Sequence, residues 1–426
     1  MKDVLIVSPH FPPVNAPDMQ RVRLALPHLA RHGWRATVLA LEPESVEGAV
    51  IDPLLEQTYP EKTRIIRVRG LSPRLTRPFG FGSIWWRCGR AFRKAGEELL
   101  QSGGFDLVFF STTQFDFFTL APLWRVAFGV PYVLDFQDPW VNDYYRRTGT
   151  RPPGGRFRYA LAHSRAVREE PKALRGAAHV ISVSPGYLDD FSRRYAWFDR
   201  ARASVHPFGA SAADLGVAAA NPPLRPLIDW NDGRRHLVYT GRAGPDMEPA
   251  LRILFRALRR HVERNPAADR LHFWFIGTSY APGSLAKPTV APIAAAENVD
   301  HLVTEHCHRV PYFEALHYQG RADAILAIGS DDRSYNASKL AGCLLAGRPA
   351  LALYREGSPA LGFVRRTGGA RAIGFGSDDE SAVTAVAAWL AEGMPADSAR
   401  PEELARITAE STTAALARTF DAALVP

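Results

Sequence analysis

Cysteine is scarce in this chain. Its 426 residues include three cysteines, Cys88, Cys307 and Cys343, which lie far apart in the sequence. Three scattered thiols are too few for a disulfide framework, and such sparse cysteine is typical of proteins that work in a reducing compartment. We therefore expect a cytoplasmic protein.

The chain also lacks a long uninterrupted hydrophobic run. Its most apolar region, Leu107–Leu134, is interrupted by Gln114, Asp116 and Arg125, which argues against a membrane-spanning helix. The N-terminus reaches the apolar stretch Val4–Ser8 after a single lysine and has no small-residue cleavage site. We expect this stretch to be a first β-strand rather than part of a signal peptide.

Two cofactor signatures are missing as well. The turn after the first predicted strand, Ser8–Pro13, does not supply the Gly-x-Gly-x-x-Gly pattern of dinucleotide-binding proteins. The consecutive residues His306, Cys307 and His308 are candidate metal ligands, but alternate residues of a strand face opposite sides, so Cys307 points away from the two histidines. Because the sequence offers no second ligand cluster, we expect no metal and no cofactor.

Positive charge is in excess and unevenly distributed. The formal net charge is +8, and the segment Lys62–Lys94 alone holds ten basic residues and no acidic one, with Trp85, Trp86 and Phe92 among them. Basic and aromatic side chains together suit an anionic bilayer surface, at about 1 kcal/mol per basic residue near the headgroups. The alternative is a solvated rim whose aromatic residues face the core. No nucleic-acid-binding motif accompanies the charge, so we favour peripheral binding to the inner face of the cytoplasmic membrane, or to an anionic acceptor.

Short apolar runs alternate with helical patterns along the whole chain. This alternation is typical of parallel sheets covered by helices, and 426 residues suffice for two such domains. The predicted fold class is α/β, with two Rossmann-like doubly wound domains that face a cleft. Ligands of such domains bind at the carboxyl ends of the strands. The predicted strands are Val4–Ser8, Ala36–Leu41, Ile65–Val68, Leu107–Phe110, Tyr132–Phe136, His179–Val183, Ser204–His206, His236–Thr240, Leu271–Ile276, His301–Glu305, Ala324–Ile328, Ala350–Leu353 and Ala370–Ile373.

The domain boundaries follow from composition. Residues 1–210 form the predicted first domain and residues 233–400 the predicted second domain. The Ala- and Pro-rich stretch 211–232 between them is predicted to be a linker. Residues 401–426 have a helical pattern, and we expect this helix to cross back to the first domain.

Four polar loops are predicted to meet at the cleft: Ser8–Arg21, Asp135–Trp140, Tyr239–Asp246 and Asn336–Pro349. In the third loop, a Gly-Arg pair combines a tight turn with a guanidinium that suits a diphosphate, and Asp246 is expected to cap the following helix.

The fourth loop is predicted to open a helix that runs over residues 337–346. Asn336 is a competent N-cap, and the free amides behind it, with the Ser338 hydroxyl and the Lys339 ammonium, would bind a phosphate or diphosphate. The alternative is an ordinary surface lysine on an amphipathic helix.

Six short motifs occur along the chain in the same order as in a known protein family. They are Phe11–Pro13 with Arg21, Pro131–Trp140 (PYVLDFQDPW), Ala177–Gly186 (AAHVISVSPG), Tyr239–Arg242 (YTGR), Arg309–Pro311 (RVP) with Ala322–Leu326 (ADAIL), and Asn336–Pro349 (NASKLAGCLLAGRP). Together they resemble a GT-B fold glycosyltransferase of family four, the retaining class that uses nucleotide-sugars. The second and last motifs are similar to those of a bacterial branch that works on lipid-linked surface polysaccharides.

The resemblance implies a role for each matched residue. Arg242 and Lys339 would neutralise the leaving diphosphate, the main chain near Val310 would touch the base, and Gln137 and Asp138 would face the reacting sugar and the acceptor. Such transfer needs leaving-group stabilisation and positioning rather than a protein nucleophile. The implied sites are catalytic residues Asp138, Gln137, Arg242 and Lys339, donor-binding residues Gly241, Arg242, Val310, Asn336, Ser338, Lys339 and Asp331, and acceptor-binding residues Asn15, Arg21 and Trp140.

The chain departs from the family pattern at several positions. Ser334 and Gly342 stand where carboxylates are usual, the latter being the ribose-binding position, and Glu248 stands where a lysine is usual. Asp331 or Asp332 is then expected to reach the sugar hydroxyls instead.

Three functions follow from this pattern. The favoured one is a hexosyltransferase-like enzyme that moves a sugar, with retention, from a nucleotide-sugar to a glycan or lipid-linked acceptor in bacterial surface polysaccharide or glycoconjugate synthesis. The missing carboxylates motivate the first alternative, a non-catalytic nucleotide-sugar-binding or assembly protein. The second alternative is a sugar-nucleotide epimerase on the same fold, which would need acid/base carboxylates aimed at the sugar carbon.

Overall fold

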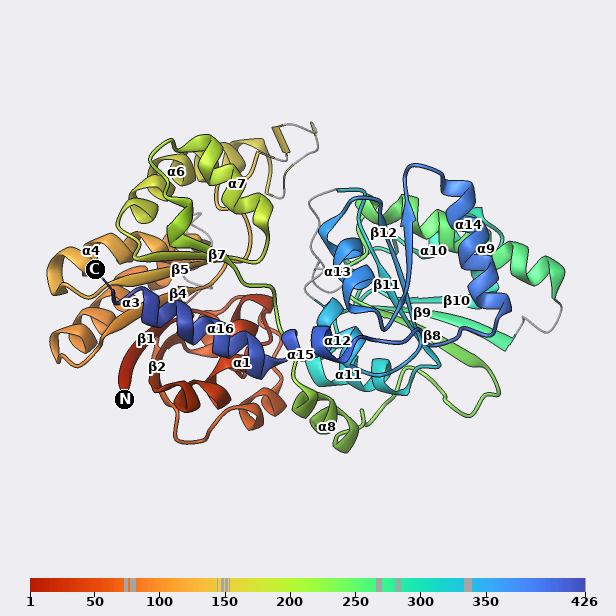
Figure 1. The fold of residues 1–426 in the computed structure, drawn as a ribbon, viewed down its shortest axis with the longest axis horizontal. Helices are drawn as coiled ribbons and strands as arrows, with labels where there is room; N and C mark the ends of the chain where they lie inside the picture. The colour runs from red at the N-terminus through yellow and green to blue at the C-terminus, as the bar shows by residue number, and fades with distance from the viewer. Residues whose placement is uncertain are drawn as a thin grey trace. The chain divides into compact units, whose positions relative to one another are not determined.

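The computed structural model describes residues 1–72, 82–143, 154–265, 270–279, 285–332 and 339–425, together with residues 76, 145, 146, 149, 152 and 281. The chain folds into two compact units (Figure 1). Unit 1 comprises Met1–Pro207 and Ala409–Pro426, and unit 2 comprises Phe208–Thr408.

Unit 1 is built on a parallel sheet with the strand order β3-β2-β1-β4-β5-β6-β7. Its strands are β1 (Lys2–Val7), β2 (Trp34–Leu41), β3 (Arg64–Val68), β4 (Leu107–Ser111), β5 (Tyr132–Phe136), β6 (His179–Ser182) and β7 (Ala203–Val205). The strand order reverses between β1 and β4. In doubly wound sheets this switch point is where loops at the carboxyl ends of the strands diverge and leave room for a ligand.

Helices cover both faces of this sheet. They are α1 (Gln20–Leu29), α3 (Ile84–Gln101), α4 (Leu120–Phe128), α6 (Arg156–Arg175), α7 (Pro185–Arg194) and α16 (Ala409–Ala422). The alternation of side chains along β1 shows the two layers, because Leu5 and Val7 join one buried cluster while Val4 and Ile6 join the other. Continuous burial of this kind explains why the strands read as uninterrupted apolar runs in the sequence.

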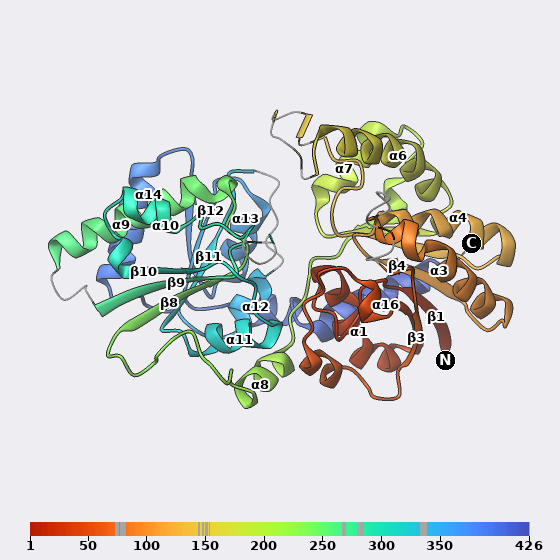
Figure 2. The same ribbon diagram turned by 180° about the vertical axis from the view of Figure 1, so that it is seen from behind.

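The last helix, α16, completes unit 1. Figures 1 and 2 both show it beside α1, although nearly four hundred residues separate the two in the sequence. Phe420 packs its ring edge against Trp34, with ring centroids 5.3 Å apart, and the Trp34 indole N–H donates to Asp421 Oδ1 at 3.1 Å. Phe420 is fully buried, so α16 supplies part of the core.

Unit 2 repeats the plan with a parallel sheet in the order β10-β9-β8-β11-β12-β13. Its strands are β8 (Arg235–Thr240), β9 (Leu271–Ile276), β10 (Val303–His306), β11 (Ala324–Ile328), β12 (Ala350–Arg355) and β13 (Arg371–Phe375). Its helices are α8 (Ala212–Ala220), α9 (Glu248–Arg264), α10 (Ala291–Ala296), α11 (Tyr312–Arg321), α12 (Leu340–Leu345), α13 (Pro359–Thr367), α14 (Asp379–Ala391) and α15 (Pro401–Arg406). The switch point of this sheet lies between β8 and β11.

The predicted α/β class with two doubly wound sheets is confirmed, and each predicted strand overlaps an observed one. Three local expectations need correction. The stretch 211–232, expected to be a linker, carries α8 within unit 2, and the Tyr312 hydroxyl of α11 donates to Asp214 on α8 at 2.9 Å. The single helix expected over 401–426 is two helices, α15 and α16, separated at Ile407. The helix expected over 337–346 begins only at Leu340.

Among the described residues, the helices are too short or too polar to cross a bilayer.

Candidate functional site

The carboxyl ends of β1, β4 and β5, which we call the unit 1 edge, hold a buried polar network. Arg21 at the start of α1 donates from Nε to Asp135 Oδ2 at 2.8 Å and from Nη2 to the His206 carbonyl at 2.6 Å. The same Asp135 oxygen accepts from Ser111 Oγ at 2.8 Å and from Gln137 Nε2 at 2.9 Å. Asp135 is fully buried and Arg21 almost so. The expected acceptor-binding Arg21 therefore joins the end of β5 to the residue that follows β7, and Asp135 links both to the end of β4 through Ser111.

Gln137 belongs to the same network. Its side-chain amide also lies 3.0 Å from the Asp18 carbonyl, and the residue is 5% exposed. The next residue, Asp138, is exposed. Reduced solvation by the surrounding protein and repulsion from Asp18 raise the pKa of Asp138 to about 6. Of this predicted pair, Asp138 faces outward, whereas Gln137 has its amide turned inward.

A histidine and an aspartate form a second pair at the unit 1 edge. His10 Nδ1 lies 2.9 Å from Asp18 Oδ1. The other Asp18 oxygen accepts from Thr112 Oγ1 at 2.8 Å and from the Thr113 N–H at 3.1 Å. Burial opposes the charged forms of both residues, but their mutual attraction and hydrogen bond prevail, so the pKa of His10 is raised and that of Asp18 is lowered. Asp18 therefore favours the charged form of an imidazole that lies at the strand ends.

Asn15, another expected acceptor-binding residue, lies in the same loop between β1 and α1. It is 8% exposed, and its backbone N–H donates to the Val50 carbonyl at 2.7 Å. The backbone of this loop is thus fixed by unit 1 itself.

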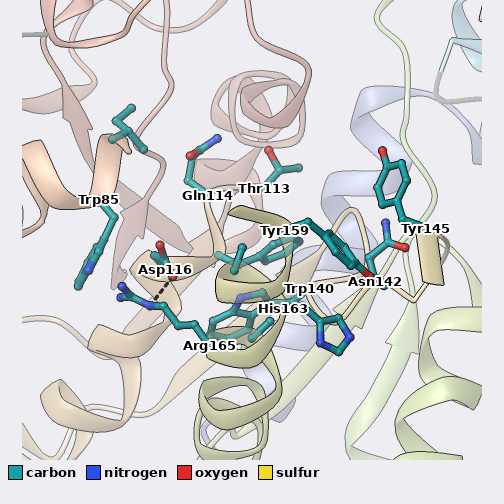
Figure 3. Close-up of a pocket in the computed structure, with 14 residues that line it drawn as sticks. Trp85, Thr113, Gln114, Asp116, Trp140, Asn142, Tyr145, Tyr159, His163 and Arg165 are labelled. Atoms are coloured by element: carbon teal, nitrogen blue, oxygen red, sulfur yellow. Dashed lines mark hydrogen bonds and ion pairs between the residues drawn. The ribbon is translucent and has the colours of Figure 1, made fainter. Parts of the chain in front are cut away.

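An open pocket of about 330 Å³, which we call the aromatic pocket, adjoins the unit 1 edge (Figure 3). Its walls come from the start of α3, from the segment after β4, from the loop after β5 and from α6. Trp140, two residues beyond Asp138, lies in this wall and stacks on Phe115 with centroids 5.8 Å apart and planes 19° apart. Opposite charges also line it, because Arg165 Nε lies 2.9 Å from Asp116 Oδ1.

The corresponding unit 2 edge lies at the carboxyl ends of β8 and β11. Lys339, just before α12, donates from Nζ to the Thr240 carbonyl at the end of β8, at 3.2 Å. The next residue, Gly241, has a φ of +142°, and a Cβ atom at this position would collide with the Lys339 ammonium. Glycine is required here for both reasons. The turn and the lysine, which the sequence predicted to share a site, are therefore in contact.

The electrostatics of Lys339 are unusual. The residue as a whole is exposed, but its ammonium lies among the strand ends, where burial lowers its pKa to about 8. Cys343 acts in the opposite direction, and the positive charge of Arg309 makes a smaller contribution that lowers the pKa further. An anion bound here would restore the protonated form, because an opposite charge favours it.

Arg242 does not stand free beside this lysine. Its guanidinium forms a two-point ion pair with Asp246, with Nη2–Oδ1 at 2.6 Å and Nη1–Oδ2 at 3.2 Å. Asp246 was expected to cap the next helix, but it lies in a 3₁₀ turn before α9 and pairs with Arg242 instead. The exposed Asp331 donates its backbone N–H to the Asp246 carbonyl at 2.8 Å, which brings the β11 loop to the same place.

Several other predicted positions can be placed. Val310 is half-buried in the segment after β10, and Glu248 pairs with Arg252 one turn along α9 at 2.7 Å. Gly342 lies on α12 with open space where a side chain would project. Asn336, Ser338 and Ser334 lie outside the described residues, so the proposed N-cap and hydroxyl are not part of the observed geometry.

The basic segment Lys62–Lys94 is less uniform than its sequence indicates. Trp86 is 62% exposed, but Phe92 is fully buried, and Trp85 is half-buried with its edge on Phe117 at 5.2 Å. Arg87 is buried and donates to the Ser45 carbonyl at 2.9 Å. Acidic partners from outside the segment or beyond its end pair with four of its cations: Arg67 with Glu56, Arg69 with Glu42, Arg93 with Glu97 and Lys94 with Glu98. Arg74 and Arg77 lie outside the described residues.

Three polar residues of the two edges were not singled out from the sequence. His10 and Asp18 lie in a loop that was recognised, but their pairing depends on the turn between β1 and α1. Arg309 belongs to a quoted motif whose main chain alone was given a role. A signal did exist, because Arg309 begins the Arg-Val-Pro motif at the carboxyl end of a predicted strand. Among the residues that the structure describes, no three His, Cys, Asp or Glu side chains are grouped so that they could hold a metal ion.

Solved structures share this fold along their whole length. The structure of Anabaena Alr3699/HepE in complex with UDP is 14% identical, with a TM-score of 0.55 over 99% of this chain and 96% of that chain. A trehalose-phosphate synthase (UDP-forming) from Burkholderia xenovorans, in complex with glucose-6-phosphate, is 12% identical, with a TM-score of 0.60 over 98% and 100%. A putative UDP-N-acetylglucosamine 2-epimerase from Listeria monocytogenes is 13% identical, with a TM-score of 0.51 over 97% and 94%.

At such identities the likeness concerns the fold alone. Two parallel sheets with Rossmann-like order, each flanked by helices, define the GT-B architecture, and this chain has it. In the sequence itself, residues 20–209 match the Glycosyl transferase 4-like domain. A search of curated proteins finds no match.

Proposed function

We propose that this protein is a glycosyltransferase that moves a sugar from a nucleotide-sugar donor to a glycan or lipid-linked acceptor. The observation that carries the proposal is the Lys339 ammonium, which meets Gly241 at the switch point of the unit 2 sheet. A partly desolvated cation beside a glycine turn suits a diphosphate, whose charge would restore the lysine to its protonated form. The glycosyl transferase 4-like match in unit 1 supports the same activity.

The donor would bind at the unit 2 edge. Lys339 would offset the charge that develops on the diphosphate as the glycosidic bond breaks, and Arg242 and Arg309 would add positive charge around it. UDP, which is bound in the Anabaena structure, is one candidate for the nucleotide. Gly342 has no carboxylate with which to bind the ribose. We therefore assign the binding of the donor hydroxyls to Asp331.

The acceptor would bind at the unit 1 edge. Asp138 and the His10 imidazole held by Asp18 would hydrogen-bond the acceptor hydroxyl and the reacting sugar, while the Arg21–Asp135 network keeps the strand ends rigid. We propose transfer with retention, as the family resemblance implies. Front-face transfer of this kind needs positioning and charge stabilisation and requires no protein nucleophile. A role in bacterial surface polysaccharide or glycoconjugate synthesis belongs to the same proposal.

Unit 1 would rest on the inner face of the cytoplasmic membrane. The support is the exposed Trp86 on α3, with Arg90 and Arg93 beside it in an apolar groove that also includes Leu123 of α4. The pairing of four cations in the Lys62–Lys94 segment with carboxylates reduces the charge available for this contact. We therefore expect weak, salt-sensitive association.

The experiment is a thermal-shift panel of nucleotides and nucleotide-sugars, followed by an assay of donor breakdown with purified protein. A selective rise in melting temperature identifies the donor, because a ligand that binds only the folded state stabilises it. Release of nucleoside diphosphate with transfer of the sugar supports the proposal. Release of a free 2-epimer would instead assign the epimerase activity that the Listeria neighbour brings into consideration. Binding without any turnover would leave the non-catalytic alternative.

A further inference from the structure

The aromatic pocket contains more than the transfer reaction needs. Figure 3 shows Trp85, Trp140 and Tyr159 around it, with Asp116 and Arg165 at one side and Asn142 at the other. At about 330 Å³ it lies at the lower end of the roughly 300–1,000 Å³ that small-molecule sites occupy.

The aromatic walls are held rigidly from behind. Phe115 stacks on both Phe136 and Trp140, at centroid distances of 5.9 Å and 5.8 Å with the planes within 23° of parallel. Trp85 stands edge-on to Phe117 on the other side. The Tyr159 hydroxyl donates to the Asn142 carbonyl at 2.5 Å, which ties α6 to the loop after β5. Flat apolar surfaces are therefore presented without a large entropy cost on binding.

The charges in the wall compensate each other. Asp116 and Arg165 form an ion pair, both about one-quarter exposed, and the Arg165 guanidinium also lies over the Trp85 ring at 5.7 Å. His163 is paired with Asp143 at 2.8 Å. A phosphate would therefore meet no surplus cation in the described lining. An aliphatic chain would displace water from the ion pair and offer no hydrogen bonds in its place, which is unfavourable. A neutral ligand with polar edges and an apolar face fits both conditions.

The pocket is joined to the unit 1 edge by the chain itself. Thr113 lines the pocket and also donates from its backbone N–H to Asp18, which holds His10. Trp140 lies two residues beyond Asp138. A ligand that extends from the edge would enter this pocket next.

We propose that the aromatic pocket binds a neutral sugar ring of the acceptor, so that the acceptor is a glycan of at least two units. The ring would lay one apolar face on the aromatic wall and direct its hydroxyls at Asp116, Arg165 and Asn142. This inference rests on the proposed function, because it takes the unit 1 edge to be the acceptor side.

The test is a titration of the full-length protein, without donor, with methyl glycosides of glucose, galactose, mannose and N-acetylglucosamine, followed by saturation-transfer NMR. We expect at least one glycoside to bind, and Asp116→Asn to weaken that binding about tenfold. Asp190→Asn, which breaks the exposed ion pair with Arg193 on α7, is the matched control and should leave the affinity unchanged. Arg165→Gln repeats the measurement from the other partner, and melting curves identify a variant that has failed to fold.

Other results overturn the inference. Absence of glycoside binding to the wild-type protein would do so, as would equal affinity in Asp116→Asn, Arg165→Gln and the control. Binding of uridine or farnesyl phosphate at the pocket in place of the glycosides would reassign it to a nucleoside or a lipid. Failure of donor binding and breakdown in the separate assay would remove the proposed function but leave measured glycoside binding intact, so the two failures are distinguishable.

Discussion

The two sheet edges treat charge in opposite ways. At the unit 1 edge two basic side chains are paired with carboxylates of the protein, Arg21 with Asp135 and His10 with Asp18. At the unit 2 edge Lys339 donates to a backbone carbonyl, and burial keeps its pKa at about 8. An edge that is already neutralised suits a neutral polyhydroxyl ligand, whereas a partly desolvated cation suits an anion. The same sheet topology thus presents two different arrangements of charge.

The largest expected effect tests whether the unit 1 network is structural. Arg21→Ala leaves Asp135 buried without its cation, and breaking a buried pair from one side costs about 3–5 kcal/mol. We expect the unfolding transition of unit 1, followed in urea, to show a loss of free energy of that size. Arg31→Ala, which removes the exposed pair with Glu410, is the control and should leave the transition in place. Equal stability of the two variants would contradict the role given to Arg21.

The second effect tests the cation of the unit 2 edge. Lys339→Ala removes the ammonium that would stabilise the leaving diphosphate, and turnover of the donor should fall by about tenfold to a thousandfold. Lys287→Ala changes an exposed lysine in the same unit and serves as the matched control. Steady-state kinetics with the donor found in the thermal-shift panel provide the measurement. Wild-type turnover in Lys339→Ala would contradict the role given to this ammonium at the unit 2 edge.

The third prediction concerns pH. With a pKa of about 8, Lys339 loses its charge as the pH rises past that value, so the affinity for a nucleoside diphosphate should fall above about pH 8. Because the unfolded chain keeps this proton up to the ordinary lysine range, stability of the free protein should rise over the same interval. Calorimetry of diphosphate binding across this range checks the first statement. Lys339→Arg carries a permanent charge, so its affinity should stay flat; a parallel decline would assign the titration to another group.

The fourth prediction concerns the pair at the unit 1 edge. The pKa of His10 is raised in spite of burial because the Asp18 carboxylate attracts the charged imidazole and hydrogen-bonds to it, so Asp18→Asn should move the imidazole titration to lower pH. In the wild type, the contribution of the His10–Asp18 pair to the stability of the fold is complete below the ordinary pKa of histidine. It is lost as the pH rises through the raised pKa of His10. Two-dimensional NMR of the His10 ring follows the titration in the wild type and in the variant. Asp190→Asn should leave the titration of His10 unchanged. An unchanged titration curve in Asp18→Asn would contradict the proposed influence of Asp18 on the pKa of His10.

The smallest effect tests the membrane contact. Trp86→Ala removes the exposed aromatic of α3 and should weaken co-sedimentation with phosphatidylserine vesicles by a few-fold, with less effect at high salt. Trp197→Ala removes another partly exposed tryptophan, one that stacks on Tyr195 at 5.1 Å, and is the control. Equal sedimentation of both variants would remove α3 from the membrane proposal.

The sequence predicts the strands well because each is buried on both faces and so appears as a continuous apolar run. Tyr132–Phe136 and Ala324–Ile328 are observed with the predicted bounds. Helix ends are harder, because they depend on tertiary contacts. Ala-rich α8 was hidden in a stretch rich in proline, and the break at Ile407 has no proline or glycine to announce it.

The site shows a similar division. The loops at both edges follow from strand order, so the place of Asp138 at the unit 1 edge and the contact of Gly241 with Lys339 could be anticipated. The partners within a loop could not, because ion pairs such as Arg242 with Asp246 and His10 with Asp18 depend on turn geometry. Arg21 was expected to bind the acceptor, but in the structure it pairs with Asp135. A sequence does not show which carboxylate a buried arginine will pair with.

The return of α16 to unit 1 has a consequence for biosynthesis. The ribosome releases the sheet of unit 1 first, then all of unit 2, and only afterwards the helix that covers Trp34 and supplies Phe420 to the core. Until then one hydrophobic face of the nascent first sheet stays incompletely covered, and exposed hydrophobic surface of this kind favours chaperone binding. Unit 2 is contiguous and can mature earlier, so the part of the chain that is translated first is the last to be completed.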